Sequence, residues 1–128
     1  MSRIVLDASA VLAILNSEAG ADKLTPRLLR DATVSTVNLA EVQSKLVSRG
    51  LDPDDAWEAA ISPVRESELF TGAQAKIAGG LVAQTRPLGL SLGDRACLAL
   101  GIELGAPIYT ADQSWKALRL GIPIHVIR

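Results

Sequence analysis

The chain of 128 residues contains few aromatic residues and a single cysteine. Aromatic side chains make up 3% of it. This argues against nucleic-acid-binding domains that stack bases on aromatic rings, such as the RNA-recognition motif and the cold-shock domain. The lone Cys97 excludes an internal disulfide and a cysteine-based zinc site, and its apolar neighbours predict a buried, inert thiol. Because hydrophobic residues still reach 48%, the core must be aliphatic.

Long hydrophobic runs are also missing. No stretch reaches the length of a transmembrane helix, and the first residues, MSRIVLD, lack the apolar segment of a signal peptide. We therefore expect a cytoplasmic protein without membrane association. The length predicts a single domain spanning residues 1–128, which is long enough to bury a core without covalent or metal cross-links.

Neither sign of charge is in clear excess. The chain has 13 basic and 14 acidic residues and a net charge of −1. If the four acids discussed below are set aside, 13 basic residues face ten acidic ones, a net charge of +3 on the remainder. This balance permits binding to a polyanion but does not predict it. Histidine is scarce too: His125 is the only one, so a general base must be a carboxylate or a water activated by a metal ion.

Alternating strands and helices are the main structural signal. Strands are expected at residues 3–6, 33–37, 63–65, 107–109 and 122–127, and helices at 9–17, 20–30, 38–49, 52–61, 71–84, 91–104 and 112–120. Pro26 should break the second helix or start its final segment, and Gly79 and Gly80 should weaken the helix that contains them. The alternation predicts an α/β fold with a parallel sheet covered on both faces, whose sites lie beyond the carboxyl ends of the strands.

Four acidic residues fall in apolar or small-residue stretches, at points where a strand gives way to a helix. They are Asp7, Glu41, Asp94 and Asp112. Burying unpaired charges is costly, so carboxylates that meet at one edge of a sheet indicate a hard-metal site. A divalent cation would relieve their mutual repulsion, and nearby helix N-termini would favour a phosphate. The pattern favours a metal-dependent hydrolase of phosphate esters.

Each acid also has a purely structural interpretation. Glu41 and Asp94 stand three residues after Asn38 and Ser91, as in capping boxes, and Asp7 and Asp112 can cap the helices that follow them. Taken singly, a cap is at least as good an explanation as a ligand. Taken together, four capping residues need not converge, whereas this topology brings all four acids to the same end of the sheet. The two roles are also compatible, because a cap can orient a metal ligand.

Several polar neighbours could support the acids. Ser9 and Thr110 stand beside Asp7 and Asp112 and could hold these carboxylates, although capping or a turn contact is the simpler interpretation of each. Asn38 could orient Glu41 or cap its helix, and the cap is the simpler interpretation. Arg95, next to Asp94, is a candidate RNA contact.

Four segments together resemble a known family: VLDASAVLAIL, VSTVNLAEV, LGLSLGDRACLALG and PIYTADQSW. In this order and spacing, and along essentially the whole chain, they are similar to the PIN-domain ribonucleases, specifically the VapC toxins of type II toxin–antitoxin pairs. Asn38 departs from the family, which usually has Ser or Thr there, and Pro26 and the pair Gly79 and Gly80 are unusual within its helices. None of these departures touches the four acids, so an active enzyme is expected.

The resemblance implies a three-layer α/β/α sandwich around a five-stranded parallel sheet. It implies an endoribonuclease that uses Mg²⁺, with Mn²⁺ able to substitute, and carries the acidic ligands over to Asp7, Glu41, Asp94 and Asp112. We hypothesise an in-line hydrolysis in which the three aspartates hold one or two ions and Glu41 holds the attacking water or a second ion. The resemblance also implies a homodimer, an RNA substrate and a cognate VapB-like antitoxin.

Other classes fit less well. A haloacid-dehalogenase-like phosphatase needs a second Asp where Ser9 stands, and a receiver domain needs an acidic pair near the first strand and a late Lys. A flap-type nuclease needs more acids and a DNA-binding arch. The alternative that remains is a catalytically silent PIN fold that binds RNA or protein, although such a module would be expected to lose some of its acids.

Overall fold

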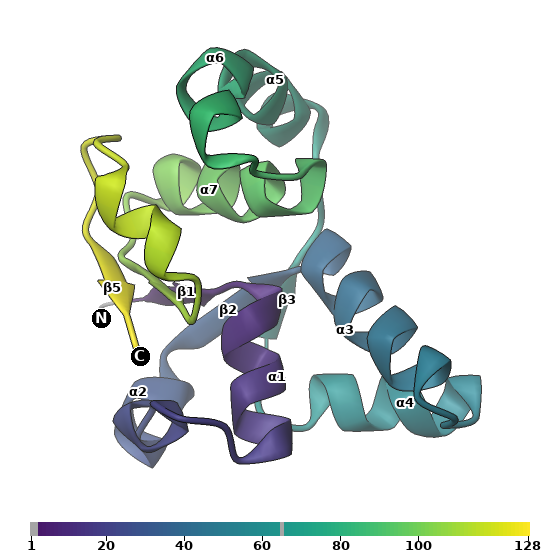
Figure 1. The fold of residues 1–128 in the computed structure, drawn as a ribbon. Coiled ribbons are helices and arrows are strands. Elements are labelled where there is room, and N and C mark those ends of the chain that lie inside the picture. The colour runs from purple at the N-terminus through teal and green to yellow at the C-terminus, as the bar shows by residue number, and fades with distance from the viewer. Residues whose placement is uncertain (1–2, 65) are drawn as a thin grey trace.

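A five-stranded parallel sheet forms the centre of the molecule (Figure 1). The computed structural model describes residues 3–64 and 66–128. Strand order is β3-β2-β1-β4-β5, with bounds β1 Ile4–Leu6, β2 Ala32–Ser35, β3 Glu66–Glu68, β4 Ile108–Thr110 and β5 Ile124–Val126. Val5 of the central strand pairs with Thr33 on one side and Ile108 on the other, and every pairing is parallel. The predicted sheet is confirmed.

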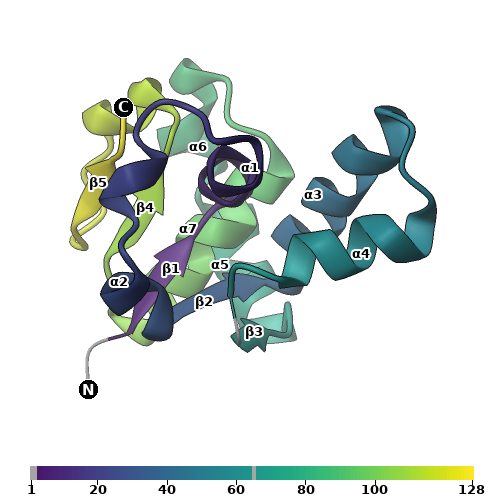
Figure 2. The ribbon, with the colours of Figure 1, turned by 90° about the horizontal axis from the view of Figure 1, so that it is seen from below.

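Helices cover both faces of this sheet (Figures 1 and 2). Their bounds are α1 Ala8–Asn16, α2 Pro26–Arg30, α3 Thr36–Ser48, α4 Pro53–Ile61, α5 Gly72–Gly80, α6 Val82–Thr85 and α7 Leu92–Leu104, with short 3₁₀ segments η1 Ala21–Lys23, η2 Arg86–Leu88 and η3 Gln113–Ala117. In Figure 1, α5, α6 and α7 lie on one side of the sheet and α1, α2 and α4 on the other. The α/β/α architecture is therefore as expected. Among the described residues, no helix has the length and hydropathy needed to cross a membrane.

Two aliphatic clusters hold the layers together. Side chains of a strand alternate between its faces, so Ile4 and Leu6 join the cluster beneath α1, α3 and α4, while Val5 joins the cluster beneath α7. Leu98 and Leu100 of α7 are fully buried in the second cluster. Each such leucine contributes roughly 1.5–3 kcal/mol when it is buried. The strand ends that lead to the acids are therefore anchored in a packed core.

Several expected elements have different bounds. The third strand was predicted at residues 63–65 but begins at Glu66, and Arg65 itself lies outside the described residues. Pro26 starts α2 after a cap by Thr25, as expected, because its fixed φ suits the first helical position. The helix predicted at 71–84 is instead α5, which ends at Gly80, followed by the separate α6.

Two helix starts are informative for the site. Ser91 and Asp94 form the predicted capping box, and Gly105 ends α7 with φ 61°. The predicted cap at Asn38 is wrong: α3 begins earlier, at Thr36, and Ser35 caps it by accepting a hydrogen bond from the Val37 amide. The predicted helix at 112–120 is only the 3₁₀ segment η3, capped by Asp112.

Candidate functional site

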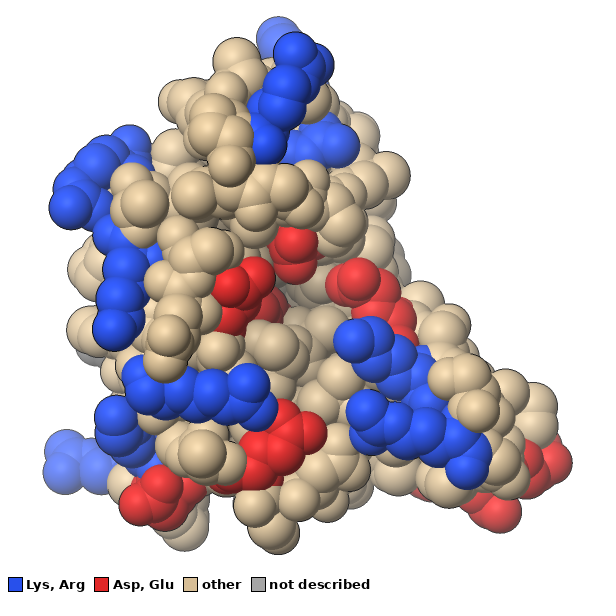
Figure 3. Space-filling model, in the orientation of Figure 1, with Lys and Arg blue, Asp and Glu red and all other residues tan. Residues whose placement is uncertain are grey.

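All four predicted acids line one cleft at the carboxyl edge of the sheet. The cleft has a volume of about 380 Å³, and Figure 3 shows acidic side chains around a hollow in this face of the molecule. The elements that supply them are the β1–α1 junction, α3, the first turn of α7 and the β4–η3 junction. The lining residues are Asp7, Ala8, Ser9, Leu12, Glu18, Glu41, Lys45, Arg49, Asp94, Asp112 and Arg128.

Asp7 forms the floor of the cleft. It directly follows β1, its side chain is 3% exposed, and its Oδ1 caps α1 by accepting a hydrogen bond from the Ala10 amide at 2.8 Å. Burial raises the pKa of Asp7 to about 6; hydrogen bonds from Thr110, Ala10 and Ser9 oppose this shift, and the charge of Asp94 adds to it. Hydrogen bonds thus hold the carboxylate in place, and within the described residues it forms no ion pair.

Ser9 and Thr110 connect Asp7 to the neighbouring strand. Ser9 Oγ donates to the Asp7 carboxylate, at 2.8 Å from Oδ1 and 2.9 Å from Oδ2, and accepts from the Ala111 amide at 2.9 Å. Thr110 Oγ1 donates to Asp7 Oδ2 at 2.6 Å and accepts from the Asp112 amide at 3.0 Å. These hydroxyl groups therefore fix the Asp7 carboxylate relative to the backbone of Asp112.

Glu41 projects from α3 beside the start of α7. Its Oε1 accepts a hydrogen bond from Asn38 Nδ2 at 2.7 Å, and the same amide nitrogen donates to the Gly93 carbonyl at 3.0 Å. Burial raises the pKa of Glu41, and the charge of Asp94 adds to the increase, while Asn38 and Lys45 oppose it. Asn38 is 1% exposed, and its two acceptors fix the amide orientation. Asn38 thus positions Glu41 and does not cap the helix.

Asp94 and Asp112 are oriented by helix starts. Asp94 Oδ2 accepts from the Ser91 amide at 2.9 Å, and Asp112 Oδ1 accepts from the amide and hydroxyl groups of Ser114 at 2.9 and 2.7 Å. Within the described residues, the second oxygen of each carboxylate has no hydrogen-bond partner, and the same holds for Glu41 Oε2. Asp94, Asp112 and Glu41 therefore each have one carboxylate oxygen that is hydrogen-bonded within the protein and one that is available to a ligand.

The charges of the cleft favour a cation. Its lining contains five carboxylates and three basic side chains, so one divalent ion would balance them. In the described parts of the chain, none of the four predicted acids forms an ion pair. Carboxylate oxygens are the ligands that Mg²⁺ and Mn²⁺ prefer. The donor set fits such an ion in chemistry and in charge.

The arrangement as it stands is more open than a finished metal site. Among residues 3–64 and 66–128, no three Asp, Glu, His or Cys side chains are grouped so that they could hold one ion. Binding of a cation would therefore have to be accompanied by adjustment of the rim side chains. Asp7, which is fixed by four hydrogen bonds, is the least free of the four to move.

Three basic residues of the cleft were missed in the sequence. Lys45, on α3, and Arg49, the residue directly after α3, follow Glu41 by four and eight residues, a spacing that puts all three on one side of the helix. Arg128 follows β5 and has no local sequence signal. By contrast Arg95, predicted as a candidate RNA contact, does not line the cleft; its Nη1 donates to the Ala78 carbonyl at 3.0 Å. An RNA contact at Arg95 stays a prediction.

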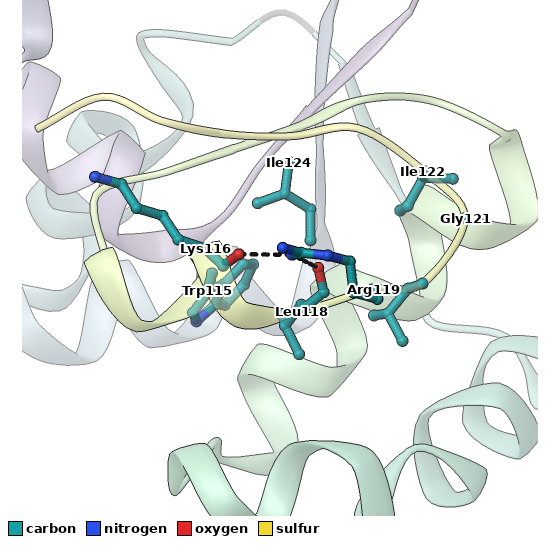
Figure 4. A pocket seen from close by; sticks show the side chains of 8 residues that line it. Trp115, Lys116, Leu118, Arg119, Gly121, Ile122 and Ile124 are labelled. Carbon is teal, nitrogen blue, oxygen red and sulfur yellow. Dashed lines mark hydrogen bonds between the residues drawn. The ribbon is translucent and has the colours of Figure 1, made fainter.

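A second cleft, of about 360 Å³, lies beside η3 and β5 (Figure 4). Its lining contains Trp115, Leu118, Ile124 and two basic side chains but, among the described residues, no acid. Arg119 Nη1 donates to the backbone carbonyls of Lys116 and Leu118 at 2.8 and 2.9 Å, so its own loop holds the guanidinium. This cleft offers neither a metal ligand nor a general base, and the candidate chemistry belongs to the acidic cleft.

Comparison with known proteins identifies a family. Residues 4–120 match the model of the PIN domain. No curated protein matches the sequence. The matched region contains the four predicted acids and the polar residues that hold them.

Solved structures share the fold at low sequence identity. DNA-bound VapBC from Salmonella typhimurium has a TM-score of 0.75 and 17% identity and covers 100% of both chains. VapBC2 from Rickettsia felis, bound to a promoter DNA fragment, has a TM-score of 0.72 and 17% identity over 94% of this chain and 96% of that one. VapC20 from Mycobacterium tuberculosis, described as a toxin that cleaves the sarcin-ricin loop, has a TM-score of 0.72 and 19% identity over 93% and 98%.

Proposed function

Because the chain belongs to the PIN domain family, we propose that it is a metal-dependent endoribonuclease, the toxin of a VapBC-type toxin–antitoxin pair. One observation carries the proposal. Asp7, Glu41, Asp94 and Asp112 come from four separate parts of the chain and line the same cleft, and no cation among the described residues pairs with them. Four structural caps would not require this convergence.

The hydrogen bonds of each acid support a distinct task for it in this proposal. Asp7 is the fixed ligand, because hydrogen bonds from Ser9, Thr110 and the Ala10 amide hold both of its oxygens. Asp94 and Asp112 would complete the cation site with their free oxygens. The starts of α1 and α7 meet at the cleft, and their positive N-terminal ends favour a phosphate group there.

Glu41 has a different environment from the aspartates. It projects from α3, its pKa is raised by burial, and Asn38 holds one of its oxygens. A carboxylate with a raised pKa is suited to accept a proton from an attacking water. A Mg²⁺ or Mn²⁺ ion bound by the acids would lower the pKa of water and stabilise charge that develops on the phosphate.

The decisive experiment is a cleavage assay on total cellular RNA. Purified protein, free of any antitoxin, is incubated with RNA in the presence of Mn²⁺, with EDTA and the Asp94→Asn variant as controls. Discrete fragments that are absent from both controls are expected. Equal cleavage by folded Asp94→Asn would contradict the assignment of the site, and cleavage that persists in EDTA would contradict metal dependence.

One observation favours a second candidate, a PIN fold that binds RNA or protein without catalysis. In the described residues, no three acids are grouped to hold an ion. A silent module would cut no RNA in that assay, with or without Mn²⁺, and a separate gel-shift experiment would show whether it binds RNA. Retention of all four acids and of their hydrogen bonds favours the enzyme.

Partners follow from the same proposal. The solved relatives include VapBC complexes, and we infer a homodimer that is silenced by a VapB-like antitoxin. Light scattering on the purified chain tests the dimer. Purification of the chain from its native cells tests the antitoxin: a small protein should co-purify with it and suppress cleavage.

A further inference from the structure

One wall of the acidic cleft carries two basic residues, Lys45 on α3 and Arg49 directly after it. Lys45 and Arg49 stand one and two helical turns after Glu41 and line the cleft with it. At 1.5 Å per residue, their backbones lie about 6 and 12 Å along the axis from Glu41. Both side chains are exposed, and neither forms an ion pair in the part of the chain that the structure describes. Their charges are thus available to an incoming anion.

Arg128 supplies a cation from a different wall. It follows β5, and α3 and β5 lie on opposite sides of α1 and β1 in both ribbon views (Figures 1 and 2). Space-filling Figure 3 shows basic side chains on two sides of the acidic hollow. The cleft is therefore acidic at its centre and basic at two edges.

A local network holds the guanidinium of Arg128 in place. Its Nη2 donates to Glu18 Oε1 in an ion pair and its Nε donates to the Ala19 carbonyl at 3.4 Å, while Asn16 Nδ2 donates to Glu18 Oε2 at 3.1 Å. Gly20 lets this loop approach, since a Cβ there would overlap with the Ile127 carbonyl. Among the described residues Nη1 of Arg128 has no partner, so a positioned donor remains for a ligand.

We propose that Lys45 and Arg49 on one side, and Arg128 on the other, bind backbone phosphates that flank the scissile phosphate of an RNA strand. The inference rests on the proposed nuclease function and deepens it. Asp7 is almost fully buried at the floor of the cleft, so the scissile phosphate must enter. A cleft of about 380 Å³ has the size of a small-ligand pocket, so only a short part of a strand lies inside it. The neighbouring phosphates then cross the two basic edges.

The test separates flanking contacts from chemistry. Binding of a single-stranded RNA fragment, one that the wild type cleaves, is measured by fluorescence anisotropy in the inactive Asp94→Asn background at several salt concentrations. Lys45→Gln, Arg49→Gln and Arg128→Gln are each expected to weaken binding several-fold and to flatten the log–log salt slope by about 0.7. Arg49→Lys and Arg128→Lys, which keep the charge, should retain most of the binding.

Matched controls lie elsewhere on the surface. Lys76 and Arg86 are exposed and lie outside the cleft, so Lys76→Gln and Arg86→Gln should bind as the parent does. In the active background, hydrolysis of bis(p-nitrophenyl) phosphate, which has no flanking phosphates, should fall far less than RNA cleavage in each cleft variant.

Three results would overturn the inference. The first is unchanged RNA binding in the three cleft variants, and the second is an equal loss in the two controls. The third is a loss confined to the α3 variants, which would contradict a second basic edge at Arg128. If the wild-type protein cuts no RNA at all, it is the proposed function that fails, and the small diester shows whether the cleft has any hydrolytic chemistry.

Discussion

The backbone of Gly93 lies directly against the carboxylate of Glu41. A Cβ built at position 93 would overlap with both carboxylate oxygens and with the carboxyl carbon. Asn38 bridges the two residues, since its side-chain amide donates to Glu41 Oε1 and to the Gly93 carbonyl. The Glu41 carboxylate can therefore hold this position only because residue 93 has no side chain. This contact sets the place of Glu41 relative to Asp94, the next residue along α7.

Replacing Gly93 should lower RNA cleavage strongly but lower the stability of the fold only slightly. In Gly93→Ala the overlapping atoms belong to the end of a flexible side chain, so the fold can accommodate the methyl group if Glu41 turns away. We expect RNA cleavage to fall at least tenfold, with a loss of about 1 kcal/mol in unfolding free energy from the disturbed hydrogen bond. Gly79→Ala is the control: it meets nothing within 4 Å and should stabilise α5 by about 0.5–1 kcal/mol. Wild-type cleavage by Gly93→Ala would contradict the role of Glu41.

Asp7 should destabilise the metal-free protein at neutral pH. Its pKa is raised by burial to about 6, from an ordinary value of 3.8, and this difference corresponds to about 3 kcal/mol. Asp7→Asn keeps an acceptor for the Ala10 amide and removes the buried charge, so its melting temperature without metal should exceed that of the wild type at pH 7.5. The same variant should cut no RNA. A lower melting temperature than wild type would show that the Asp7 charge is already compensated.

The stability of the metal-free protein should depend on pH with a definite sign. Since the folded-state pKa of Asp7 lies above its unfolded value, the folded protein binds more protons between pH 4 and pH 6. Its unfolding free energy should therefore fall as the pH rises through about 4 to about 6, and should then level off. Glu41, whose pKa is also raised, acts in the same direction. Denaturant titrations of wild type and Asp7→Asn across this range provide the check, and the slope should be smaller in the variant.

Asn38 should control the protonation of Glu41. Its hydrogen bond lowers the pKa of that carboxyl group, against the effect of burial. In Asn38→Ala the pKa of Glu41 should rise further, and the acidic limb of the pH profile of kcat/KM should move to higher pH. The Gly93 carbonyl also loses this side-chain donor, so the free energy of unfolding should drop by about 1 kcal/mol. An unchanged pH profile with reduced stability would assign Asn38 a purely structural role.

Sequence patterns that span a few residues predicted the parts of the site that neighbouring residues form. Ser91 and Asp94 stand three residues apart at a helix start, and the capping box they predict is formed. The convergence of the acids followed from topology, because parallel strands present their carboxyl ends at one edge. Asn38 was misjudged because β2 ends at Ser35, which takes the cap and leaves Asn38 inside the first turn.

Other features depend on contacts that the sequence does not indicate. Lys45 and Arg49 were overlooked, although their spacing from Glu41 is a readable helix-face pattern. Arg128 could not have been assigned to the cleft, because the packing of Gly20 against Ile127 brings it there. Nor does the sequence reveal the close approach at Gly93, which depends on the packing of α3 against α7.

Titration of the purified protein with Mn²⁺ tests the central claim most directly, namely that the acids of the cleft form a cation site. Calorimetry on wild type, Asp7→Asn, Asp94→Asn and the control Asp22→Asn, whose exposed acid lies outside the cleft, separates this site from surface binding. We predict saturable binding in the wild type and in Asp22→Asn, and its loss in both cleft variants, each shown to be folded. Equal binding by all four proteins, or no binding by folded wild type at millimolar Mn²⁺, would contradict the claim that the acids of the cleft form a cation site.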